Sequence, residues 1–535
     1  MDKALEMGKT SVTGSVQLFI GQASSTIIMA VGTIILARLM LPEEYGLYAV
    51  ALIPSTMINL FHDWGIGPAM TKYIAQYRAA NKEEDIHDII TAGLIFKIAT
   101  GLALTLLSLT LASFIATAIF NRPESTSLIA IASIVIFSES LLTATRYVFT
   151  GFERMELNSL TMISYSTIKT VASPLLVLLG YGALGAVLGH TFSFLIGGIL
   201  GLIILYLILF RKLSKRTKTH KSNITKTLKT MLRFGVPLSI ATILGGFLTQ
   251  FYSFIMVLYC TDAMIGNYQI ATNFAVLLTF FTFPIETVLF PAFSKLDPKN
   301  EHQLVQTVFT SSVKYTAILL VPATMAVIVL SKPMIYTLFG GKWVYAPFFL
   351  SLYVITNLLV LFGGLVKNSL LAGLGETKIL MKLRLLTLSL GISLAFILIP
   401  TFGIMGVILG TLLAAIPSFF WGLYWVWKHY EATVDWMSST KIFLASAIAA
   451  VTTYLSLNFL NTAEWLRLIT GGAIFLTIYV VVAPSVGAIV QDDTRNLRVM
   501  FSGLSFISTI VNLLLGVVEK IAGINSARKV KPLND

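Results

Sequence analysis

The chain has 535 residues, of which 56% are apolar and 12% are charged, against roughly 25% charged residues in ordinary soluble domains. A mean hydropathy of +0.83 is typical of a polytopic membrane protein. The single cysteine, Cys260, excludes a disulfide framework and a cysteine-based metal cluster. The net charge of +13 alone would be compatible with nucleic-acid binding, but no recognition helix or basic-aromatic surface accompanies it.

Long apolar runs predict the transmembrane helices. A bilayer core about 30 Å thick needs about 20 mostly apolar residues per helix. Fourteen runs meet this requirement, and short polar turns with Pro, Gly or Asn separate many of them. They lie near residues 13–37, 46–69, 88–118, 126–149, 156–180, 183–209, 232–259, 264–291, 304–330, 347–372, 378–399, 403–427, 441–460 and 465–488.

The first twelve of these runs form one six-helix unit that occurs twice. Three segments of the first half return in the second half at offsets of 220 to 223 residues, and Gly151 answers Gly373. Such a repeat is how many secondary transporters build two bundles around one site. The segment pairs are Gly46–Ala51 with Gly266–Ala271, Pro68–Lys72 with Pro291–Lys295, and Tyr181–Gly189 with Phe402–Gly410.

Lysine and arginine predict the orientation in the membrane. With the N-terminus in the cytoplasm, the inner segments carry 28 basic residues and the outer turns carry five, as the positive-inside rule requires. Both termini are then cytoplasmic, in a multi-pass protein of the cell membrane. The basic segment Arg211–Lys221 is interpreted as a linker near anionic lipid headgroups, with a regulatory partner as the alternative.

These patterns predict an all-α membrane protein of fourteen helices, in two six-helix bundles plus two C-terminal helices. A polar stripe along 501–521 predicts a further helix that lies on the inner membrane surface rather than a fifteenth span. The expected parts are an N-terminal bundle (1–210), a basic linker (211–230), a second bundle (231–430), transmembrane helices thirteen and fourteen (431–490) and an amphipathic tail (491–535).

Ionisable residues inside the apolar runs are the candidates for the functional site. Leaving seven such groups in lipid would cost roughly 20 kcal/mol at roughly 3 kcal/mol each, so they are expected to line a hydrated cavity. Asp63 and Glu286 stand five residues before Pro68 and Pro291, so the repeat makes them equivalent. The seven residues are Asp63, Lys97, Glu139, Lys169, Glu286, Lys314 and Lys367, and Arg146 lies on the same helix face as Glu139, seven positions on.

Each of these residues also has a structural interpretation. Lys97, Lys314 and Lys367 are alternatively anchors that snorkel to the membrane surface. Asp63 and Glu286 are alternatively partners of nearby lysines or caps of broken backbone, and Glu139 with Lys169 a buried pair. His62 and His190 are interpreted as packed or hydrogen-bonded rather than proton-coupling.

The sequence shows no sign of an enzyme. It contains no phosphate-binding loop of the Walker type, no HExxH and no CxxC, and the outer turns are too short for a catalytic domain. We expect no cofactor and no bound metal, with coupling to Na⁺ or H⁺ left open.

Three segments resemble the Wzx-type polysaccharide flippases. They are Leu41–Val50 and Asp63–Met70, around the first turn and the second helix, and Thr150–Arg154 after the fourth helix. The layout of six, six and two helices is also similar to that family. The resemblance implies the fold of the multidrug/oligosaccharidyl-lipid/polysaccharide exporter superfamily, with a V-shaped transporter and alternating access. Its lipid II flippases have two further C-terminal helices that form a groove for the lipid tail, a role that helices thirteen and fourteen would take here.

The resemblance further implies a substrate in which a polyprenyl phosphate or pyrophosphate carries an oligosaccharide. Such a flippase moves it from the inner to the outer leaflet for cell-surface glycan assembly. Lysines suit this substrate because an ammonium is a mobile point charge for phosphate. We therefore expect Lys97, Lys169, Lys314, Lys367 and Arg146 to bind the head group, and Asp63, Glu139 and Glu286 to balance the empty cavity or bind a coupling cation.

Two other functions remain open at this point. One is a cation-coupled drug or metabolite antiporter of the same superfamily, although such proteins usually stop at twelve helices. The other is a membrane scaffold for a glycan-assembly complex, which would leave the intramembrane charges without a purpose. In the flippase interpretation the partners are the lipid-linked oligosaccharide, membrane lipids and glycan-assembly enzymes, with no nucleic acid.

Overall fold

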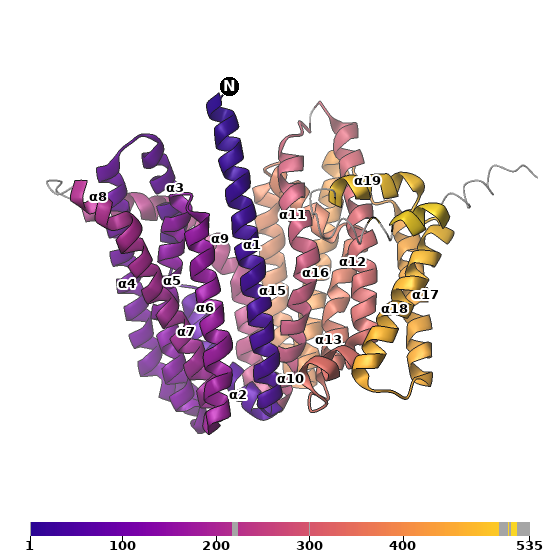
Figure 1. Ribbon diagram of the computed structural model, residues 1–535, viewed down its shortest axis with the longest axis horizontal. Coiled ribbons are helices and arrows are strands. Elements are labelled where there is room, and N and C mark those ends of the chain that lie inside the picture. The colour runs from indigo at the N-terminus through magenta and orange to yellow at the C-terminus, as the bar shows by residue number, and fades with distance from the viewer. Residues whose placement is uncertain (1, 217–222, 299, 502–511, 513–514, 522–535) are drawn as a thin grey trace, which may run out of the picture. The chain divides into compact units, whose positions relative to one another are not determined.

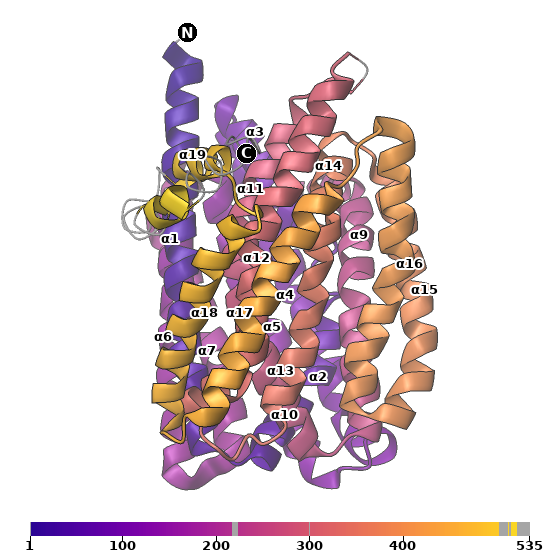
Figure 2. The ribbon, with the colours of Figure 1, turned by 90° about the vertical axis from the view of Figure 1, so that its right-hand side faces the viewer.

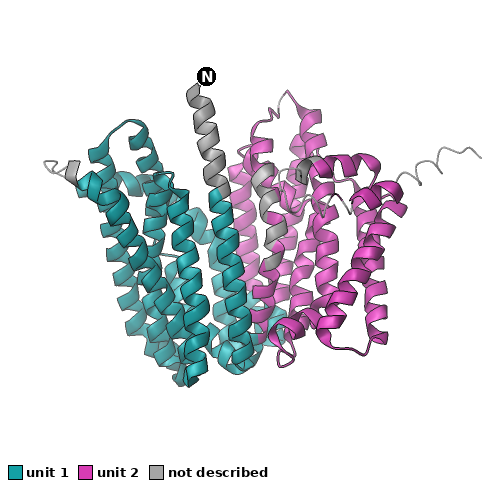
Figure 3. Ribbon diagram, in the orientation of Figure 1, with its two compact units in different colours: residues 1–266, 395–407 teal, residues 267–394, 408–535 magenta. Residues whose placement is uncertain are grey.

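A computed structural model describes residues 2–216, 223–298, 300–501, 512 and 515–521 (Figure 1). All regular structure in these ranges is helical, as the apolar runs predict, and no β-strand occurs there. The helices belong to two compact units (Figure 3). Unit 1 is residues 1–266 with 395–407, and unit 2 is residues 267–394 with 408–535.

Unit 1 is organised around α5 (Thr126–Gly151), on which α2, α3, α4, α6 and α7 all pack. Small residues of α5, including Ser133, Ser140 and Ala144, are fully buried, and small side chains let neighbouring helices approach closely. The other helices of unit 1 are α1 (Asp2–Leu39), α2 (Pro42–Asn59), α3 (Ile66–Ala79), α4 (Glu83–Phe114), α6 (Met155–Leu176), α7 (Gly182–Leu205), α8 (Arg211–Arg216) and α9 (Ile224–Tyr259).

Unit 2 is organised around α12 (His302–Phe339), which packs against helices on both sides of it in the sequence. Its C-terminal helices α17 (Trp436–Phe459) and α18 (Glu464–Ser485) lie side by side (Figure 2) and both contact α12. The other elements of unit 2 are α11 (Thr279–Ser294), α13 (Ala346–Val354), η6 (Ile355–Phe362), α14 (Gly364–Gly373) and α19 (Gln491–Phe501). Three helices have residues in both units: α10 (Asp262–Ala275), α15 (Thr377–Phe402) and α16 (Ile404–Tyr430).

Breaks interrupt several of the predicted spans. The predicted helix 46–69 is divided between α2 and α3, and Trp64 and Gly65 at the break have φ of 47° and 74°. A left-handed backbone cannot continue an α-helix, and Gly65 adopts it without a Cβ penalty. The predicted helix 347–372 bends by 57° next to Gly363, whose φ is 84°.

These breaks affect the number of membrane spans. Within the described residues, ten helices are long and apolar enough to cross a membrane, or eleven if the bent pair around Gly363 is one span. The stretch Met155–Ser214 is one of the ten, although it holds both α6 and α7, which pack on one another. The broken segments α2–α3 and α10–α11 are not among them. Fourteen spans and the repeat organisation therefore stay predictions.

The predicted domain limits and the predicted tail also stay predictions. The repeat assigns 231–430 to one bundle, whereas α9 packs against α2, α3 and α4 of unit 1. Most of the predicted amphipathic segment 501–521 lies outside the described residues. The described segment just before it, α19, is an amphipathic helix within unit 2.

Candidate functional site

The break between α2 and α3 places a carboxylate inside unit 1. Asp63 lies in the break, and its Oδ1 accepts a hydrogen bond from the backbone N–H of Gly67 at 3.1 Å, near the start of α3. The same carboxylate forms an ion pair with Lys97 of α4. Asp63 is therefore both a backbone cap and a lysine partner, the structural alternative that the sequence left open.

Lys97 is one of the largest fully buried side chains of the protein, with 0% exposure. The pair with Asp63 compensates its charge, and the ring of Tyr147 on α5 lies 5.8 Å from Nζ. The hydroxyl of Ser140 donates to the Lys97 carbonyl at 2.8 Å, which ties α5 to α4 at this level. A buried lysine without an acidic partner would be strongly disfavoured, so the ion pair holds α4 against the α2–α3 break.

Glu139 of α5 is the second carboxylate of this cluster. The amide of Asn59, the last residue of α2, donates to its Oε2 at 2.6 Å. Glu139 interacts electrostatically with Lys97, Arg146 and Lys169. The Arg146 guanidinium is held by Asn158 of α6, whose Oδ1 accepts from Nε at 2.9 Å. Glu139 thus lies among three cations.

Lys169 of α6 differs from Lys97 in its partners. No carboxylate of the described residues lies within ion-pair distance of its ammonium, and Glu139 is the acidic group that interacts with it. His190 of α7 interacts electrostatically with Lys169, and its Nδ1 is 2.8 Å from the hydroxyl of Tyr48. His190 and His62, which donates to the Asn59 carbonyl at 2.6 Å, are hydrogen-bonded as predicted.

Unit 1 therefore brings together five of the eight predicted site residues. They come from α4, α5, α6 and the α2–α3 break, and they count three cations against two carboxylates. Asn59, Tyr147 and Tyr48 complete the cluster and were not predicted from the sequence. Asn59 had a usable signal, since it is a polar residue at the end of an apolar run, four positions before Asp63. The five predicted residues are Asp63, Lys97, Glu139, Arg146 and Lys169.

The other three predicted residues belong to unit 2. Lys314 of α12 pairs with Asp493 of α19 at 2.7 Å, a partner that the sequence did not indicate. Lys367 of α14 is 5% exposed, and its ammonium lies 4.9 Å from the centre of the Phe419 ring. Glu286 stands on α11, and its side chain lies outside the described residues. Within the described part of the chain, no group of three or more His, Cys, Asp or Glu is arranged to hold a metal ion.

Comparison with known sequences assigns the family. The sequence profile described as "Polysaccharide biosynthesis protein" matches residues 11–297. A curated relative, the probable low-salt glycan biosynthesis flippase Agl15 of Haloferax volcanii, is 22% identical over 255 residues. That alignment covers 46% of this chain and 53% of Agl15, so the chain matches about half the length of this relative.

Comparison with solved structures identifies the fold. The lipid II flippase MurJ in an inward closed conformation superposes with a TM-score of 0.66 at 17% identity, covering 88% of this chain and 98% of MurJ. An inward-facing multidrug resistance MATE transporter superposes with a TM-score of 0.63 at 19% identity, covering 78% of this chain and 99% of that chain. Because the profile match extends over more than half of the chain, this multi-pass membrane protein belongs to the polysaccharide biosynthesis protein family, and it has the fold of MurJ and the MATE transporters.

Proposed function

We propose that this protein is a flippase for a polyprenyl phosphate or pyrophosphate that carries an oligosaccharide. The observation that carries the proposal is the charged cluster of unit 1, in which three cations and two carboxylates lie within apolar helices. Such groups inside a membrane protein are costly and mark a substrate or ion pathway. Family membership and the MurJ-like fold support a lipid-linked glycan as the substrate.

The partners of each cation divide the predicted binding residues by role. Lys97 is paired with Asp63 and Lys314 is paired with Asp493, so we assign a structural role to these two lysines. Lys169 and Lys367 form no ion pair with a described carboxylate. An ammonium in that situation gains most from a phosphate oxygen. We assign contact with the anionic head group to Lys169 and Lys367. We assign to Arg146 the role of positioning the Glu139 side chain.

The transport cycle that fits this assignment is alternating access. The two compact units are the bodies that would move, each carrying one of the two lysines. Glu139 and Asp63 keep the empty site near neutral, and Glu139 is the carboxylate that we assign to a coupling Na⁺ or H⁺. The positive-inside pattern favours both termini in the cytoplasm and substrate entry from the inner leaflet. Glycan-assembly enzymes of the same membrane would supply and remove the substrate.

A transport assay tests the proposal. Purified protein in liposomes is given a fluorescent polyprenyl-pyrophosphate oligosaccharide, and its appearance in the opposite leaflet is followed by quenching. Lys169→Ala and Lys367→Ala should each lower the initial rate by at least about tenfold, since each removes one charge-assisted contact of about 1.5–3 kcal/mol. Lys212→Ala is the matched control, because Lys212 is an exposed lysine of α8 outside the cluster. Rates within twofold of the parent in both test variants would refute the assignment.

The alternative is a cation-coupled antiporter for drugs or metabolites, which the similarity to the MATE transporter favours. The MATE alignment covers 78% of this chain and the MurJ alignment covers 88%, so the MATE fold leaves more of the chain unmatched. The two functions differ in their ion dependence and substrate. Efflux of a cationic dye driven by a Na⁺ or H⁺ gradient, with no movement of the lipid-linked glycan, would decide for the antiporter.

A further inference from the structure

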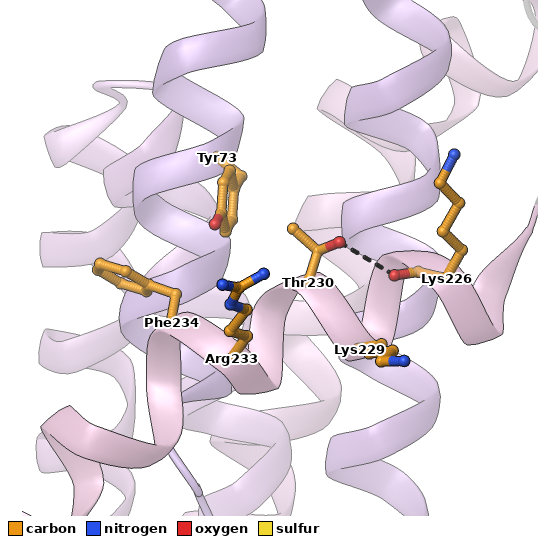
Figure 4. A pocket seen from close by; sticks show the side chains of 6 residues that line it. All are labelled: Tyr73, Lys226, Lys229, Thr230, Arg233 and Phe234. Atoms are coloured by element: carbon orange, nitrogen blue, oxygen red, sulfur yellow. Dashed lines mark hydrogen bonds between the residues drawn. The ribbon is translucent and has the colours of Figure 1, made fainter.

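A pocket of about 450 Å³ lies between α3 and the first turns of α9, and none of its lining residues belongs to the charged cluster of unit 1 (Figure 4). Both helices belong to unit 1 and pack on one another. Figure 4 shows Tyr73, Thr230 and Arg233 turned toward one space, with Phe234 beside them. The lining residues are Tyr73, Lys226, Lys229, Thr230, Arg233 and Phe234.

The pocket carries a concentrated positive charge. Three of its lining residues are cations, and a fourth cation, Lys72, lies at its edge with Nζ 3.9 Å from the centre of the Phe234 ring. No carboxylate of the described residues forms an ion pair with any of the four. A cluster of like charges without counter-ions repels itself, and an anion bound between them relieves that repulsion. By contrast, the buried Lys97 of the same unit is paired with the carboxylate of Asp63.

The residue types select a phosphate group. A guanidinium offers paired N–H donors that match phosphate oxygens, and lysines add mobile charge. Tyr73 and Phe234 meet edge to face with centroids 6.0 Å apart and form an apolar wall beside these donors. A small hydrophilic anion would gain nothing from contact with that apolar wall. A phosphate attached to a lipid chain could pack its apolar part against it.

The position along α9 matches the depth of lipid headgroups. A helix of 36 residues is about 54 Å long at 1.5 Å per residue, which exceeds a hydrocarbon core of about 30 Å. Five of the six pocket residues lie in its first three turns, where every cation of the helix stands, and the turns after Phe234 are largely apolar. The first turns therefore reach the headgroup layer while the rest of the helix crosses the core.

We propose that this pocket binds the phosphate of a membrane lipid headgroup. Two lipids present that chemistry: an anionic glycerophospholipid, or the polyprenyl pyrophosphate carrier before it enters the site at Lys169. The second source rests on the proposed function, and the first is independent of it. In either case Arg233 makes the central contact, with Lys226 and Lys229 adding attraction.

Calorimetric titration of the full-length protein in a non-ionic detergent tests the proposal. The probes are dioctanoyl phosphatidylglycerol, farnesyl pyrophosphate, and dioctanoyl phosphatidylcholine as a headgroup of no net charge. Arg233→Gln should weaken binding of at least one anionic probe by at least about tenfold, and added salt should weaken it further. Lys212→Gln, which removes an exposed cation of α8 in the same unit, should leave binding unchanged.

The pattern of loss identifies the source. Loss with phosphatidylglycerol alone assigns a bound bilayer lipid, and loss with farnesyl pyrophosphate alone or with both probes assigns carrier binding. A Lys226→Gln/Lys229→Gln double variant, with both changes at exposed positions, provides the same test if Arg233→Gln folds poorly. The proposal is wrong if both anionic probes bind the parent and these variants within twofold. Because transport by Lys169 variants is a separate measurement, either proposal can fail alone.

Discussion

At the scale of single residues, the charges in the membrane helices divide into compensated and uncompensated ones. Lys97 and Lys314 each have one carboxylate partner, and these two contacts connect α4 to the α2–α3 break and α12 to α19. Lys169 and Lys367 have none among the described residues. Buried pairs of this kind contribute little net stability, but removing one partner is costly because the other charge is left behind. Whether a buried lysine has a carboxylate partner therefore indicates the role of that lysine better than how deeply it is buried.

The Asp63–Lys97 pair leads to a test by charge removal. Asp63→Asn should lower the free energy of unfolding by about 3–5 kcal/mol, because it leaves the buried Lys97 ammonium unpaired. Adding Lys97→Met should restore most of that loss, since the new amide side chain would keep the oxygen that accepts from the Gly67 N–H. Denaturant titration in detergent micelles measures both values.

The exposed pair between Arg78 and Glu153, 3.0 Å apart, provides the comparison for that experiment. Glu153→Gln should cost less than about 1 kcal/mol, because solvent screens an exposed ion pair. An Asp63→Asn variant as stable as the parent would show that Lys97 does not depend on Asp63.

At the scale of elements, two glycines that the repeat pairs with one another lie at one close helix contact. A Cβ on Gly46 of α2 would strike the backbone carbonyl of Asp262 at the start of α10. A Cβ on Gly266 of α10 would strike the carbonyl of Pro42 and come within 3.1 Å of the Gly46 nitrogen. The contact is reciprocal, because positions 42 and 46 meet positions 266 and 262. Only glycine permits two helix backbones to approach so closely.

This contact predicts an unusual response to alanine. Gly46→Ala or Gly266→Ala should destabilise the protein by about 1–3 kcal/mol, because the backbones must separate to admit the methyl group. Thermal unfolding of purified variants measures the effect as a lower apparent melting temperature.

Gly472 of α18 is the matched control, since nothing lies within 4 Å of its Cβ position. Gly472→Ala should stabilise by up to about 1 kcal/mol, as expected for a helix interior. Equal effects at all three glycines would contradict the close contact.

At the scale of the whole molecule, the chain after α18 turns back and packs against α12 within unit 2. Asp493 of α19 is 3% exposed, and in addition to pairing with Lys314 it accepts from the Val490 N–H at 2.8 Å. The amide of Asn496 donates to the Tyr315 hydroxyl at 2.7 Å, and Leu497 is buried in the apolar cluster that includes Val321. The segment after the last membrane helix is thus fastened to α12.

Variants of the Lys314–Asp493 pair can distinguish a structural role of Lys314 from the substrate-binding role that the sequence predicted. Lys314→Ala and Asp493→Ala should both lower stability, and a double-mutant cycle should give a coupling of about 0.5–3 kcal/mol. Transport per folded molecule should be unchanged in both single variants if the pair is structural.

The opposite outcome for the Lys314–Asp493 pair would assign Lys314 to substrate binding. A Lys314→Ala protein that is stable but inactive, beside a normal Asp493→Ala protein, would return Lys314 to the substrate site. Transport by each variant, normalised to the folded fraction, is the deciding measurement.

Much of the candidate site could be predicted because a charge inside an apolar run is visible without a structure. Asp63, Lys97, Glu139 and Lys169 were named on that basis, and Arg146 was named because it shares a helix face with Glu139. All five lie together in unit 1. Their partners could not be predicted in the same way. Asp493 lies 179 positions from Lys314, beyond the last predicted span, and Asn59 and Tyr147 are ordinary residues until the helices are packed.

Residue types and run lengths were enough to predict that the chain is helical, enters the membrane many times and carries a costly set of buried charges. Those properties follow from the transfer of side chains between water and hydrocarbon, which is a local quantity. Where helices break, which lysines pair with a carboxylate and which have no described carboxylate partner became clear only from the packed helices. Pairing depends on distances between side chains far apart in the chain, and a left-handed residue such as Gly65 redirects a whole helix and the carboxylate beside it.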